Sequence, residues 1–106
     1  MSKPKYRWWG YVKNVVNDLL PRSDSADLTP EAIREWRAVQ RAVKFTRQLP
    51  EGEKQVAIMN YVYQGKEKRT LKEAAAIVGV SENLAKEWHS DFLRCVGYEL
   101  GFTVLY

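Results

Sequence analysis

Few side chains in this 106-residue sequence are of the kinds that catalyse reactions or bind metals. The sequence contains one histidine, His89, and one cysteine, Cys95, six positions apart. A nucleophilic cysteine needs a base that a third group orients. A cysteine and a histidine at this spacing lack that orienting group. No cluster of cysteines and histidines could hold a metal, and the six glycines are scattered rather than gathered in a phosphate-cradling loop. We therefore predict a protein that is not an enzyme and that uses no metal or cofactor.

The composition indicates one folded domain of ordinary size. Hydrophobic residues make up 45% of the chain and aromatic residues 12%, which argues against disorder. A single cysteine cannot form an internal disulfide and favours a reducing compartment. The apolar runs are too short to cross a membrane, and the N-terminus lacks the apolar stretch of a signal peptide. We expect a soluble, cytoplasmic protein without a membrane partner.

The net charge of +4 permits an anionic partner without requiring one. Residues 73–106 carry two basic and five acidic side chains, so the basic charge lies elsewhere. One side of the second expected helix is basic through Arg34, Arg37, Arg41, Lys44 and Arg47. Such a stripe is either a solvated helix face or a surface that grips phosphate.

Apolar periodicity and capping residues predict an all-α fold of four to five helices. We expect helices at about 8–20, 29–49, 51–63, 71–78 and 82–100. The apolar face of the first comprises Trp8, Tyr11, Val12, Val15, Val16 and Leu19. The apolar face of the second comprises Trp36, Ala38, Val39, Ala42, Val43, Phe45 and Leu49.

Residues 70–93 have the pattern of a helix-turn-helix. Ala75 is small enough for two helices to cross closely, and Gly79 suits a turn that needs a positive φ. Ser81 is positioned to cap the second helix. The side chains expected to face the core recur at intervals of three and four residues: Ala85, Trp88 and Phe92.

The outer face of this second helix would enter the major groove of DNA. The base-reading candidates on it are Ser81, Glu82, Asn83, Lys86, Glu87 and Ser90. An asparagine matches the edge of adenine and a lysine that of guanine. The candidates for phosphate contacts are Lys66, Lys68, Arg69, Lys72 and His89. The alternative is that the motif is purely structural or binds a protein.

Two stretches, LPEGEKQVAIMNYVYQG and TLKEAAAIVGVSENLAKEW, together resemble the fourth conserved region of bacterial sigma factors. The resemblance covers about residues 49–95. It is carried by Leu49-Pro50-Glu51, Gly65, Glu73-Ala74-Ala75 and Gly79-Val80-Ser81. The aromatic KYRWWGYVKN block, the EWRAV and AVKFTRQLP segments and AKEWHSDFL also resemble small phage-encoded activators of the ArpU/RinA type. That resemblance implies a helical DNA-binding regulator of phage late genes.

Together, these features predict a sequence-specific DNA-binding transcriptional regulator of phage or prophage origin, acting in the bacterial host cytoplasm on double-stranded DNA. Residues 1–28 would form an aromatic amphipathic helix and connector, and residues 29–106 the helical DNA-binding domain. One rival is the small subunit of a phage terminase, which would assemble into a ring. Another is a sigma-like module that docks on RNA polymerase, which the acidic C-terminal third favours. The DNA target, any homo-oligomer, activation or repression, and the role of the apolar FTVLY tail stay open.

Overall fold

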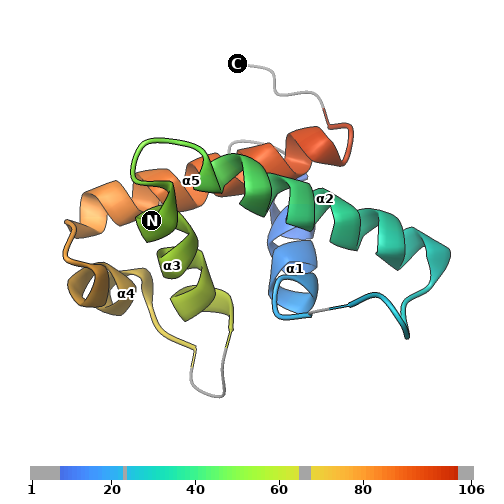
Figure 1. Ribbon diagram of the computed structural model, residues 1–106, viewed down its shortest axis with the longest axis horizontal. Helices are drawn as coiled ribbons and strands as arrows, with labels where there is room; N and C mark the ends of the chain where they lie inside the picture. The colour runs from blue at the N-terminus through green and yellow to red at the C-terminus, as the bar shows by residue number, and fades with distance from the viewer. Residues whose placement is uncertain (1–7, 23, 65–67, 103–106) are drawn as a thin grey trace.

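The computed structural model describes residues 8–22, 24–64 and 68–102, and these residues form five helices and no strand (Figure 1). The helices are α1 (Trp9–Leu19), α2 (Pro30–Arg47), α3 (Gly52–Tyr63), α4 (Leu71–Val78) and α5 (Glu82–Glu99). The predicted all-α class is confirmed, and every observed helix end lies within two residues of the expected one. None of the helices in the described part of the chain is long and apolar enough to span a membrane.

The helices pack around one hydrophobic core. α2 and α5 lie side by side and share the most extensive contact between any two helices. α1 and α3 each contact both of them, and α4 packs against α3 and α5 (Figure 1). Every helix contributes a fully buried side chain to this core, for example Val16, Val39, Ile58, Ala74 and Leu93. The aromatic first helix therefore completes the core that the other four helices share.

Hydroxyl side chains cap the starts of three of the helices, as the sequence predicts at Ser81. Thr29, Thr70 and Ser81 each accept a hydrogen bond of 3.1 Å from the backbone N–H three residues further on. This bond satisfies a donor that the helix itself leaves free. At α4 the Glu73 carboxylate also accepts from the Thr70 backbone N–H at 3.0 Å, which lowers the pKa of Glu73. The helices that flank the predicted turn thus have well-defined starts.

The connection between α2 and α3 brings two backbone segments close together at Gly52. Glu51 has a left-handed backbone with a φ of 58°, which is why α3 begins at Gly52 rather than at Glu51. A Cβ atom added to Gly52 would lie 2.4 Å from the carbonyl oxygens of both Thr46 and Arg47. Real Cβ atoms essentially never approach that closely, so only glycine fits this position.

Aromatic side chains join the start of α1 to the end of α5. The Trp8 ring stacks on Phe102 with a centroid separation of 5.4 Å and an angle of 7° between the planes. A Cβ atom on Gly97 would come within 2.6 Å of the Trp8 ring, so the tryptophan lies where a side chain would otherwise be. Of the apolar tail, Phe102 therefore covers the body of the domain, whereas residues 103–106 lie outside the described residues.

Two aromatic residues assigned to apolar faces are about half exposed. Tyr11 is 46% exposed and meets Phe102 only edge-on, and Phe45 is 54% exposed. Their expected burial was wrong because the apolar arcs of α1 and α2 are wider than the neighbouring helices can cover. Trp88 is buried, and Trp8, Trp9 and Trp36 pack against the core while partly exposed.

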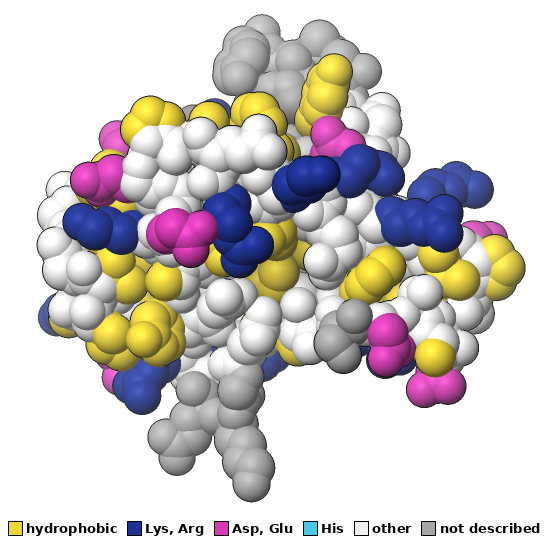
Figure 2. Space-filling view, viewed as in Figure 1, with side chains coloured by type: hydrophobic (Ala, Val, Ile, Leu, Met, Phe, Trp, Pro, Cys, Tyr) yellow, Lys and Arg dark blue, Asp and Glu magenta, His cyan; other side chains and the backbone are white. Residues whose placement is uncertain are grey.

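Charge is divided unevenly between the two longest helices. α2 carries five basic and two acidic side chains, a net charge of +3, whereas α5 carries two basic and four acidic, a net charge of −2. Figure 2 shows Lys and Arg side chains in a row across the part of this face that α2 occupies in Figure 1. Two adjacent helices of the fold thus present opposite charge.

Candidate nucleic-acid interface

The turn between α4 and α5 consists of three residues, Gly79, Val80 and Ser81. Gly79 has a φ of +89°, as the sequence predicts, and its N–H donates to the Ala75 carbonyl oxygen at 2.8 Å. Ala75 itself is 2% exposed and lies in the core. The small residue and the left-handed glycine together bring α4 and α5 into direct contact.

One face of α5 is buried and the opposite face is open to solvent. The three residues predicted to face inward, Ala85, Trp88 and Phe92, are all buried. The outward face holds all the base-reading candidates: Ser81, Glu82, Asn83, Lys86 and Glu87 are exposed, and Ser90 is partly exposed. The structure thus brings this set together on one accessible surface.

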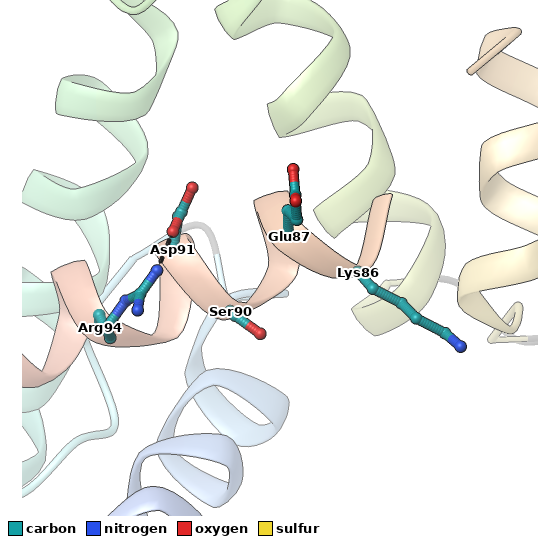
Figure 3. Close-up of a pocket in the computed structure, with 5 residues that line it drawn as sticks. All are labelled: Lys86, Glu87, Ser90, Asp91 and Arg94. Atoms are coloured by element: carbon teal, nitrogen blue, oxygen red, sulfur yellow. Dashed lines mark hydrogen bonds and ion pairs between the residues drawn. The ribbon is translucent and has the colours of Figure 1, made fainter. Parts of the chain in front are cut away.

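Ion pairs organise the outer face of α5. The Lys86 ammonium lies 3.6 Å from the Glu82 carboxylate, and Arg94 pairs with Asp91. Figure 3 shows Asp91 and Arg94 pointing toward each other while Lys86 extends away from them. Exposed pairs of this kind contribute at most about 1 kcal/mol, so a ligand that offers a better partner can separate Lys86 from Glu82. With Glu87 included, these charged side chains carry a net charge of −1.

The accessible face extends beyond the predicted motif. A shallow, open hollow of about 440 Å³ is lined by Lys86, Glu87, Ser90, Asp91 and Arg94 (Figure 3). Asp91 and Arg94 were not among the sequence-based candidates. The signal that could have found them is the spacing, because Asp91 follows Glu87 by four residues and Arg94 follows Ser90 by four.

Three basic residues lie just before α4 or in its first turn, and two of them hydrogen-bond to neighbouring helices. Lys68, Arg69 and Lys72 all have exposed side chains. The Lys68 ammonium donates to the Asn17 side-chain oxygen at 2.5 Å, and the Arg69 backbone N–H donates to the carbonyl oxygen of a residue in α3 at 3.0 Å. These cations therefore lie at the start of α4. Lys66 and Gly65, which the sequence also singled out, fall outside the described residues.

His89 lies apart from these exposed cations. Its Nε2 atom is 2.5 Å from the Tyr63 hydroxyl oxygen, and the two rings stack with centroids 5.7 Å apart. Burial, together with the positive charge of Lys13, lowers the pKa of His89 to about 4. The imidazole is therefore neutral at pH 7 and offers no cationic group to a phosphate, so we leave His89 out of the proposed contacts.

The described residues hold no group of three or more His, Cys, Asp or Glu side chains that could bind a metal. Burial, together with the nearby Glu99 carboxylate, raises the pKa of the Cys95 thiol to about 11. The thiol is consequently protonated at neutral pH and is a poor nucleophile. The outer face of α5 presents polar and charged side chains through which a partner could be recognised.

Comparisons of the chain with protein-family models, with curated proteins and with solved structures found no match.

Proposed function

We propose that this protein is a sequence-specific DNA-binding regulator of transcription in which α4, the turn and α5 act as a helix-turn-helix. One observation carries the proposal. The first half of α5 is anchored through buried Ala85 and Trp88, while its whole opposite side is exposed and polar. A helix held in this way can enter the major groove without any rearrangement of the core.

The side chains on this face suit base edges. Asn83 can donate to and accept from adenine, and Lys86 can donate to the O6 and N7 atoms of guanine. Glu87 can accept from the amino group of cytosine. Lys68, Arg69 and Lys72 would hold the phosphate backbone beside the groove and fix the register of the domain. The phage or prophage origin of this regulator is implied by the resemblance to the ArpU/RinA activators.

The test measures fluorescence anisotropy on random-sequence duplex DNA and on duplexes selected from a library by the wild-type chain. We expect Lys86→Ala to weaken binding to the selected duplex by about 10- to 100-fold, because one good base contact is worth about 1–3 kcal/mol. Binding to random duplex should change by a small factor only.

Lys54→Ala is the matched control, since Lys54 is also exposed and also pairs with a carboxylate, that of Glu51 at 3.9 Å. It lies on α3 and is not one of the proposed contact residues, and we expect this variant to bind like the wild type. An equal loss on every sequence would reassign Lys86 to a phosphate contact. Failure of the wild type to select any sequence would reject specific recognition.

Docking on a protein such as RNA polymerase is the second candidate function. The net negative charge and the ion pairs of the outer face of α5 favour it, because a surface of this kind repels phosphate. This function predicts capture of RNA polymerase by the wild-type chain, loss of capture in Glu87→Lys, and no binding to duplex DNA at low salt. A ring-sized mass in light scattering would instead favour the terminase small subunit.

A further inference from the structure

The outward side of α2 forms a basic ridge, which we define as Arg34, Arg37, Arg41, Lys44 and Arg47. All five residues are exposed. They span 13 positions, so the ridge is about 20 Å long at 1.5 Å per residue. Figure 2 shows Lys and Arg side chains in a row over this part of the molecule. None of the ridge residues belongs to the α5 surface described above.

The members of the basic ridge differ in how far their charge is already compensated. Arg41 pairs with Glu99 of α5 at 2.6 Å, and Arg47 pairs with Glu53 of α3 at 3.2 Å. Arg34 lines a hollow with the acidic Glu31 and Glu35.

Arg37 and Lys44 make no ion pair with any residue that the structure describes. They lie seven residues apart, which places them two helical turns apart on the same side of α2. Their two charges are therefore available to a partner.

We infer that the basic ridge of α2 is a second contact surface, which binds the phosphate backbone of duplex DNA independently of base recognition by α5. The length of the ridge corresponds to about six base-pair steps along the axis of duplex DNA, at 3.4 Å per step. The charges also repeat every three to four residues, which makes them neighbours on one side of the helix. Because the outer face of α5 carries net negative charge, attraction to DNA must come from another part of the protein, and α2 has the largest positive charge of the five helices.

The test is a salt series of binding to random-sequence duplex DNA. Each phosphate contact adds about 0.9 to the slope of log affinity against log salt. We expect Arg37→Gln/Lys44→Gln to reduce that slope by about 1.8 on every sequence, while the preference for the selected duplex is retained. Both side chains are exposed and unpaired in the described structure, so circular dichroism should show an unchanged fold.

The control is Lys13→Gln/Lys54→Gln, which removes the same charge from exposed positions on α1 and α3. A slope equal to that of this control would overturn the inference, and it is also the result expected if α2 binds an acidic protein instead. A reduced slope without any sequence preference would support the ridge while rejecting the proposed function of α5. No binding of the wild type to duplex DNA at low salt would reject both.

Discussion

The burial of His89 makes the stability of the fold depend on pH. The folded chain holds His89 at a pKa of about 4, whereas an unfolded histidine titrates near 6.5. Between those values the unfolded chain binds more protons, so the free energy of unfolding falls as the pH is lowered from about 6.5 towards 4. We expect a loss of about 1.4 kcal/mol per pH unit at most from this side chain, measurable by urea unfolding at pH 7 and pH 5.

The variant His89→Gln isolates this contribution. It keeps every carboxylate, so any remaining pH dependence comes from those groups, and the difference in stability between pH 7 and pH 5 should shrink by on the order of 2 kcal/mol. The same pH dependence in both proteins would mean that the imidazole already binds a proton in the folded state.

Gly79 provides a second prediction for a single residue. A Cβ atom added there would meet nothing within 4 Å, so the cost of a substitution comes from the left-handed backbone alone. We expect Gly79→Ala to cost about 1–2 kcal/mol, and Gly79→Val to cost more because a β-branched residue resists a positive φ. Thermal unfolding measures the cost of both substitutions.

Gly10→Ala is the control for these substitutions. The site on α1 is equally open but helical, and Tm should rise slightly. An unchanged Tm in Gly79→Val would contradict the turn geometry.

At the scale of helices, the contact of Trp8 with Gly97 fixes the start of α1 on the end of α5. Gly97→Ala places a methyl group 2.6 Å from the ring, so the ring must move and lose its stacking on Phe102. We expect a loss of about 1–3 kcal/mol, the usual cost of overpacking, with a shift in tryptophan fluorescence. In the Trp8→Ala background the same change should be neutral or stabilising, because alanine favours a helix more than glycine does. Equal costs in both backgrounds would show that the ring is not the obstacle.

Helix positions could be predicted closely because local chemistry determines them. Ser81 caps α5 in the structure as its sequence context predicts, and Gly79 adopts the left-handed turn. The start of α3 was less predictable. It depends on Glu51, whose side chain gives no indication of a left-handed backbone.

The candidate site could be predicted less completely than the helices. Helical periodicity was sufficient to place Asn83, Lys86 and Glu87 on an exposed face. It could not place His89, because the partner that turns it inward, Tyr63, lies 26 residues away in the sequence. Contacts of that kind arise from packing between helices, and the spacing of residues within one helix does not reveal them.

For the whole molecule, the shared core predicts a single cooperative unfolding transition. Val16 of α1 is fully buried among residues of the other helices. Val16→Ala should therefore cost about 2 kcal/mol and lower the Tm of the entire chain by about 10 °C, with circular dichroism and tryptophan fluorescence giving the same midpoint. Lys13→Ala, at an exposed site of the same helix, should leave Tm nearly unchanged. Separate transitions for the two probes would show that α1 melts on its own.

The missing side chain at Gly52 has a consequence for how this architecture can diversify. Because the Thr46 and Arg47 carbonyl oxygens occupy the space of a Cβ atom, any of the other amino acids there would force α3 to rotate away from α2. Most core positions tolerate replacement by apolar side chains of similar volume. Position 52 tolerates no such replacement, because every other amino acid has a Cβ atom. A lineage that lost this glycine would therefore keep its five helices only by adopting a different angle between the second and the third.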